Sequence, residues 1–129
     1  MNAVLGVDLG LKRIGVALLL GEIPIPLDPI IRKNRNQASS ELKALIKEYK
    51  AQKLVFGVPK GSSGEEMRRR IEHFVSLLEF EGEVFYVDED FSSIEALESV
   101  KGLLKDKKSG KIDSISAKII LERWLEAKS

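Results

Sequence analysis

The stretch VLGVDLGLKR at residues 4–13 decides how this sequence folds. Its valines and leucines predict a buried strand over residues 3–8, and Gly10 begins a turn that ends at Arg13. The strand carries a single carboxylate, Asp8, at its carboxyl end. Aspartate also stabilises turns, so Asp8 by itself has a structural interpretation as well as a chemical one.

A second strand is predicted over residues 14–20, where Gly21 ends the apolar run. Prolines at 24, 26 and 29 then bracket an extended segment over residues 25–32. Proline lacks a backbone N–H and is tolerated at the edge of a sheet, not at its centre. The first three strands are therefore expected to form an antiparallel meander with the proline-bearing strand outermost.

The rest of the chain alternates helical and strand patterns. Four helices are predicted. The first covers residues 37–50, the second follows the loop KGSSGEE, the third runs from Ser92 to residue 103 or 104, and the fourth covers residues 113–127. Short strands are predicted at residues 54–58 and 84–87. Strands that are separated by single helices favour parallel pairing. We therefore expect one α/β domain, residues 1–129, with a mixed five-stranded sheet (three antiparallel strands plus two parallel) and helices on both faces.

Composition narrows the class of protein. Of the 129 residues, 43% are apolar and none is cysteine, which fits an ordinary globular core and excludes disulfides and cysteine-based zinc sites. Charges interrupt the apolar stretch near the N-terminus, so it is not a membrane span, and we expect a cytoplasmic protein.

The charge pattern is more informative than the net charge of +1. Residues 71–100 contain nine acidic residues and no lysine or arginine, whereas cations gather at residues 32–35, 68–70 and 105–111. An acidic centre with basic edges suits an enzyme that holds metal ions and a polyanion together. Each basic run taken singly is better explained as a solvated surface.

Candidate acids stand at the ends of three predicted elements. Asp8 ends the first strand, the run DED at residues 88–90 ends the last strand, and Asp113 begins the final helix. If the first and last strands are parallel, their carboxyl ends meet at one rim, which is where open α/β sheets bind ligands. Ser116 and Ala117 are small and would let the final helix approach the sheet closely.

Clustered carboxylates repel one another, and a divalent cation removes that cost. Oxygen ligands suit Mg²⁺ or Mn²⁺, and a pair of such ions supports phosphodiester hydrolysis without cysteine, histidine or an organic cofactor. We interpret His73 as exposed and inert, and Trp124 as a core residue, because of their places in the helical patterns.

Four segments together resemble the YqgF/RuvX family of RNase H-like nucleases. They are GVDLGLKRIGVALL, VFGVPKGSSGEE, VDEDFSS and DSISAKIILERWL, in the family's order and over nearly the whole chain. The resemblance implies an RNase H-like fold and selects Asp8, Glu89 and Asp113 as catalytic and metal-binding residues. Strand alternation places Asp88 and Asp90 on the opposite face from Glu89. Asp90 departs from the basic residue usual in the family.

The resemblance also implies a function, which is maturation of the 5′ end of pre-16S rRNA. Pre-rRNA is thus favoured over branched DNA as the nucleic-acid partner, and the protein is expected to be a monomer or a homodimer. Lys12, Arg13, Lys107 and Lys108 are the candidate substrate-binding cations.

Three alternatives remain open from the sequence. The first is a Holliday junction resolvase acting on DNA. The second is a non-catalytic RNA-binding module for ribosome assembly, against which the three retained acids argue. The third is an ATP-binding phosphotransferase of the actin–hexokinase type, which normally needs a duplicated domain and a second phosphate loop; this chain is too short for both.

Overall fold

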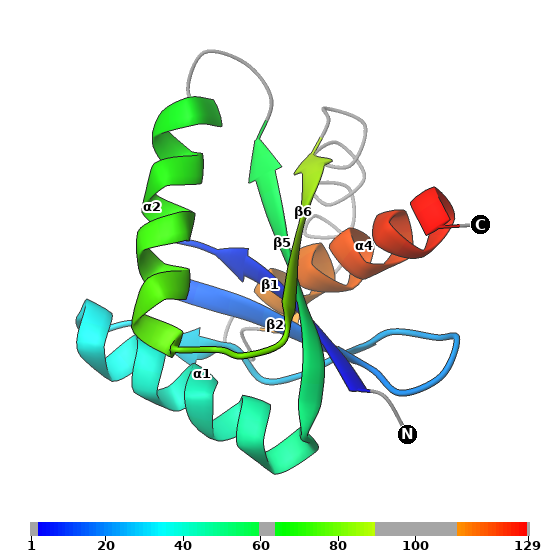
Figure 1. The fold of residues 1–129 in the computed structure, drawn as a ribbon, viewed down its shortest axis with the longest axis horizontal. Helices are drawn as coiled ribbons and strands as arrows, with labels where there is room; N and C mark the ends of the chain where they lie inside the picture. The colour runs from blue at the N-terminus through cyan, green and yellow to red at the C-terminus, as the bar shows by residue number, and fades with distance from the viewer. Residues whose placement is uncertain (1–2, 60–63, 90–110, 129) are drawn as a thin grey trace.

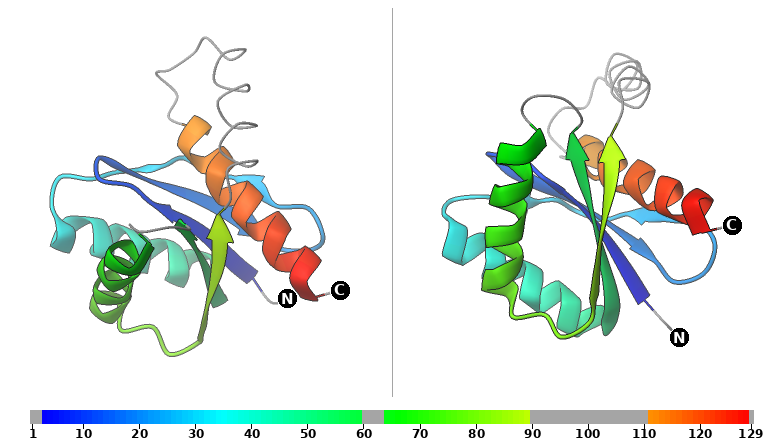
Figure 2. Two further views of the ribbon diagram at one scale, coloured as in Figure 1. Left: turned by 90° about the horizontal axis from the view of Figure 1, so that it is seen from above. Right: turned by 45° about the horizontal axis from the view of Figure 1, so that its top comes forward.

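The computed structural model describes residues 3–59, 64–89 and 111–128. Its strands are β1 (Ala3–Leu9), β2 (Arg13–Leu19), β3 (Ile25–Pro26), β4 (Ile30–Ile31), β5 (Ala51–Pro59) and β6 (Glu83–Glu89). Its helices are α1 (Arg35–Tyr49), α2 (Gly64–Leu78) and α4 (Lys111–Lys128). One sheet separates two layers of helices, with α1 and α2 on one face and α4 on the other (Figures 1 and 2).

Strand β1 lies at the centre of the sheet. It pairs antiparallel with β2, where Val7 is opposite Val16, and parallel with β5, where Val7 is opposite Phe56. Strand β6 extends the sheet parallel to β5, in the order β3-β2-β1-β5-β6. The mixed sheet predicted from the sequence is therefore confirmed, and the carboxyl ends of β1, β5 and β6 share one edge.

The third predicted strand differs from the expectation. Instead of one strand over residues 25–32, the structure has two short strands, β3 and β4, which both pair antiparallel with β2. The described sheet thus has six strands rather than five. Pro26 and Pro29 explain the break, because each lacks an N–H for the ladder and has a fixed φ. The edge position of this segment was predicted correctly.

Alternation along the strands divides the core in two. Leu5, Val7 and Leu9 of β1 face α1 and α2, whereas Val4 belongs to the cluster under α4. The apolar stripe of α2 packs on the first side and includes Ile71, Phe74 and Leu78. On the other side Trp124 is only 6% exposed, which confirms its prediction as a core residue.

Helix α1 has well-defined ends. Asn34 is the N-cap, and its side chain and that of Gln37 form a reciprocal capping box. Lys50 ends the helix in a left-handed conformation with φ 54°. The predicted caps Ser62 and Ser63, and the predicted helix from Ser92, lie outside the described residues.

Candidate active site

Asp8 lies on the face of the sheet that α4 covers. Alternate residues of a strand have the same parity and face the same side of the sheet. Asp8 therefore shares its face with Val4, which packs under α4, and with Gly6, which α4 contacts directly. Its backbone is paired with Gly15 of β2, and its side chain is partly buried. The carboxylate that the sequence singled out is therefore next to the last residue of the central strand, facing the helix that carries Asp113.

The register of the sheet places position 89 on the same face. Glu89 is the last residue of β6 and is paired with Pro59. Its parity is that of Phe85 and Val87, which pack with the α4 cluster, whereas Asp88 has the opposite parity and is exposed. Asp90 lies outside the described residues.

Gly57 of β5 lies between Asp8 on β1 and Val87 on β6, two residues before position 89. Strand β5 separates β1 from β6, and the register puts Gly57 opposite Val87. Gly57 has the parity of Val55, which lies under α4. No side chain from β5 therefore stands between Asp8 and β6 at this level of the face.

The first turns of α4 are fixed to the sheet close to Asp8. The fully buried Ser114 accepts a hydrogen bond at Oγ from the backbone N–H of Val16, at 3.2 Å. Val16 neighbours Gly15, the strand partner of Asp8, and its amide lies at the break between β3 and β4. The bond thus holds position 113, one residue before Ser114, near the rim. Sequence reasoning missed Ser114, although it lies on the helical stripe of Ala117 and Leu121.

One turn further along α4, the helix touches the backbone of β1. A Cβ atom on Gly6 would lie 2.8 Å from the carbonyl oxygen of Ala117. The close approach that the small residues predicted is therefore made by Ala117, against a glycine. Among the side chains that the structure describes, no three acidic, histidine or cysteine residues form a metal-binding group; Glu89 and Asp113 lie outside that set.

The candidate substrate-binding cations are only partly described. Lys12 and Arg13 are exposed in the turn that follows Asp8, and the backbone of this turn is held by a bond from Gly10 N to Arg13 O, at 3.1 Å. Lys107 and Lys108 lie outside the described residues.

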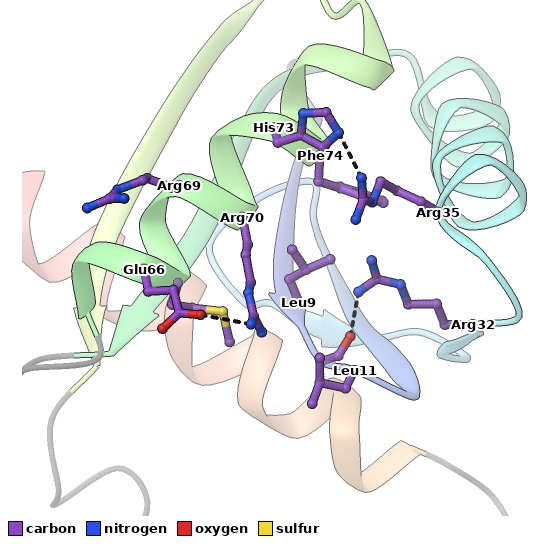
Figure 3. A pocket seen from close by; sticks show the side chains of 11 residues that line it. Leu9, Leu11, Arg32, Arg35, Glu66, Arg69, Arg70, His73 and Phe74 are labelled. Atoms are coloured by element: carbon purple, nitrogen blue, oxygen red, sulfur yellow. Dashed lines mark hydrogen bonds and ion pairs between the residues drawn. The ribbon is translucent and has the colours of Figure 1, made fainter.

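A second basic region lies on the other face of the sheet, at the same end of β1. It is a pocket of about 590 Å³ (Figure 3). Arginines from two sequence runs meet there, from residues 32–35 and 68–70, together with His73. His73 is exposed, as predicted from its place off the apolar stripe, but its Nε2 accepts a hydrogen bond from Nη1 of Arg35, at 3.0 Å.

Comparison with known proteins identifies the family. The family model described as "RuvX: Holliday junction resolvase" matches residues 2–127. This chain belongs to the RuvX family. A relative from Sulfurovum sp. (strain NBC37-1) is 57% identical over 92% of this chain and 94% of its own length, and one from Campylobacter lari is 58% identical over 92% and 93%. Both carry the name "Putative pre-16S rRNA nuclease".

Solved structures confirm the RNase H-like fold of this RuvX chain. RuvC of T. thermophilus, in complex with a Holliday junction substrate, superposes with a TM-score of 0.63 at 10% identity, over 100% of this chain and 98% of that one. The fowlpox virus Holliday junction resolvase gives a TM-score of 0.56 at 12% identity, over 97% and 99%. None of the helices in the described parts of this RuvX chain is long and apolar enough to cross a bilayer.

Proposed function

We propose that this chain is a divalent-metal-dependent nuclease whose site is built from Asp8, Glu89 and Asp113. The observation that carries the proposal is the register of the sheet. It gives Asp8 and position 89 the same parity, on the face where Ser114 fixes the first turns of α4. This register and the hydrogen bond of Ser114 support a site in which three acids that are remote in sequence meet at one rim.

The donor set fits Mg²⁺ or Mn²⁺. Carboxylate oxygens are the hard ligands that both ions prefer, and the candidate set contains no sulfur or imidazole donor. Asp8 is partly buried at the end of a strand, where repulsion from two further acids would be only weakly screened. Asp8, Glu89 and Asp113 would together hold one or two ions.

The acidic and basic residues have different roles in the proposed hydrolysis. Asp8, Glu89 and Asp113 would hold the divalent ions, which would supply activation of a water for attack on phosphorus and stabilisation of the charge on the leaving oxygen. Because positions 8 and 89 lie on strands and position 113 lies on α4, the three acids would be held in place by the fold before substrate binds. Lys12 and Arg13, on the exposed turn after Asp8, would bind the phosphate backbone and set its position at the rim. Lys107 and Lys108 are proposed to contribute to the same charge attraction.

The favoured substrate is the 5′ region of pre-16S rRNA. The names carried by relatives that are more than half identical over most of the chain support this choice. A four-way DNA junction is the alternative substrate, which the description of the family model favours.

The test compares both substrates with one variant. The parent should cleave an RNA that spans the 5′ end of 16S rRNA in Mg²⁺ or Mn²⁺, and Asp8→Asn should reduce the rate by at least about a hundredfold. A synthetic four-way junction of equal nucleotide length serves as the competing substrate. If Asp8→Asn cleaves as fast as the parent, the assignment of the site is wrong. If the parent binds RNA and cleaves neither substrate under any metal, the chain is a binding module.

A further inference from the structure

The pocket on the α2 side of β1 has both charged and apolar walls. The turn Leu9–Leu11 forms one wall, the start of α1 a second, and the first half of α2 a third (Figure 3). Leu9, Met67 and Phe74 supply apolar surface, and Leu11 stands at its edge with 75% of its surface exposed. A volume of about 590 Å³ is larger than a single phosphate needs and falls in the range of sites that take nucleotide-sized ligands.

Two arginines in this pocket have no carboxylate partner among the described residues. Arg32 donates from Nη1 to the carbonyl oxygen of Gly10, at 2.9 Å, and its guanidinium lies 5.7 Å from the centre of the Phe74 ring. Arg35 is bonded to His73 Nε2, at 3.0 Å, and can donate this bond only to a neutral imidazole. Burial and the positive charge of Arg35 both lower the pKa of Arg32. The two cations therefore destabilise each other.

The neighbouring arginines of α2 are compensated. Arg70 pairs with Glu66 at 2.9 Å, and Arg69 lies 4.0 Å from Glu65, each one turn apart on the helix. Among the described residues, the positive charge of the pocket that has no acidic partner is thus concentrated at Arg32 and Arg35.

The position of Arg35 on α1 adds to the imbalance. Arg35 is the first residue of α1, where the positive end of the helix dipole disfavours cations. The first turn of α1 has no acidic residue, and its capping box is made by the neutral side chains of Asn34 and Gln37. A bound anion would relieve both the repulsion between the arginines and the unfavourable dipole interaction.

We propose that this pocket binds a phosphate of the nucleic-acid substrate at a position other than the cleaved bond, with Arg32 and Arg35 as the phosphate ligands. This inference rests on the proposed function, because it assigns the phosphate to the same nucleic acid. Leu9 follows Asp8 directly but has the opposite parity, so the pocket and the candidate active site flank one strand end. A nucleic-acid strand that crosses the turn after Asp8 would reach both the pocket and the candidate active site. The apolar wall at Leu11 and Met67 fits a ribose or base next to the phosphate.

Binding without cleavage tests the pocket directly. The affinity of the full chain for a fluorescent single-stranded RNA from the 5′ end of 16S rRNA is measured by anisotropy in EDTA, over a range of salt. Arg35→Gln should weaken binding about five- to tenfold and reduce the slope of log K against log salt by about 0.7. Lys47→Gln, which removes an exposed charge from the last turn of the same helix, is the matched control and should change affinity less than twofold.

Thermal unfolding separates binding from folding. Arg35→Gln should raise Tm by about 1–3 °C, because it removes an unfavourable charge at the start of α1. Arg35→Lys should keep most of the salt slope. A variant that loses affinity while gaining stability supports a binding role, whereas equal affinity in Arg35→Gln and Lys47→Gln overturns the proposal.

Two further comparisons distinguish RNA from inorganic phosphate as the ligand, and failure of the pocket proposal from failure of the proposed function. If Arg35→Gln abolishes binding of inorganic phosphate but leaves RNA affinity unchanged, the pocket serves a small ligand and the proposal is wrong. If Arg35→Gln weakens RNA binding while the parent cleaves no substrate, the pocket stands and the nuclease assignment fails. If cleavage depends on Asp8 but Arg35→Gln binds RNA as tightly as the parent, the nuclease assignment stands and the pocket proposal fails.

Discussion

Gly6 of β1 and Ala117 of α4 are in direct backbone contact. A Cβ atom on Gly6 would lie 2.8 Å from the carbonyl oxygen of Ala117 and 2.5 Å from Cγ of Leu121. Gly6 is two residues before Asp8, and Ala117 is one helical turn after Asp113. The contact therefore sets the distance between the strand and the helix that carry two of the three proposed metal ligands.

Gly6→Ala should push α4 away from the sheet. The added methyl group has no space, so we expect a loss of about 1–3 kcal/mol in the free energy of unfolding. Urea denaturation followed by fluorescence measures it, because the single tryptophan, Trp124, lies on the buried face of α4. Gly21→Ala is the control, since nothing lies within 4 Å of its added Cβ, and it should change stability by less than about 0.5 kcal/mol. Equal stabilities of the two variants would contradict the contact.

Ser114→Ala should destabilise the protein by about 1–3 kcal/mol, because it leaves the buried amide of Val16 without its acceptor. The same urea denaturation measures the change. Ser116→Ala, two residues away and only partly buried, should stay within about 0.5 kcal/mol of the parent. If the two serine variants lose the same stability, the hydrogen bond to Val16 contributes nothing specific.

Glu89→Gln and Asp88→Asn should separate the two acids at the end of β6. Position 89 shares its parity with Asp8, and Asp88 has the opposite parity. Under the proposed function, Glu89→Gln should reduce metal-dependent cleavage by at least about a hundredfold, while Asp88→Asn keeps it within about threefold. Single-turnover cleavage at saturating Mn²⁺ is the measurement. A result with the two variants reversed would move the site to the other face of β6.

Lys50→Gly should stabilise the protein by about 1 kcal/mol. Lys50 ends α1 with φ 54°, a conformation that glycine adopts without the steric cost of a Cβ atom. Lys47→Gly, inside the last turn of the same helix, should instead cost about 1 kcal/mol. Opposite signs in chemical denaturation confirm the cap; two losses of similar size would contradict it.

The order and type of the elements could be predicted because they depend on local patterns. The apolar run before Asp8, the helical spacing of Leu42, Leu45 and Ile46, and the apolar stripe of α2 each reflect which side chains of one element are buried. The prolines correctly indicated an edge segment, but the pattern did not reveal that it divides into β3 and β4. That division depends on which backbone amides of β2 form hydrogen bonds with the edge segment. The amide of Val16 is instead bonded to Oγ of Ser114.

The sequence by itself determined that acids end the first and last strands, that a glycine turn follows Asp8 and that small residues begin the final helix. Only the tertiary structure decided which of these groups share a face. The bond between Ser114 and Val16 joins residues 98 apart, and the arginines of two separate runs meet in one pocket. The register between β1, β5 and β6 likewise gives positions 8 and 89 the same parity. Strand pairing and helix docking join distant segments through packing of the whole core, and no local pattern encodes that geometry.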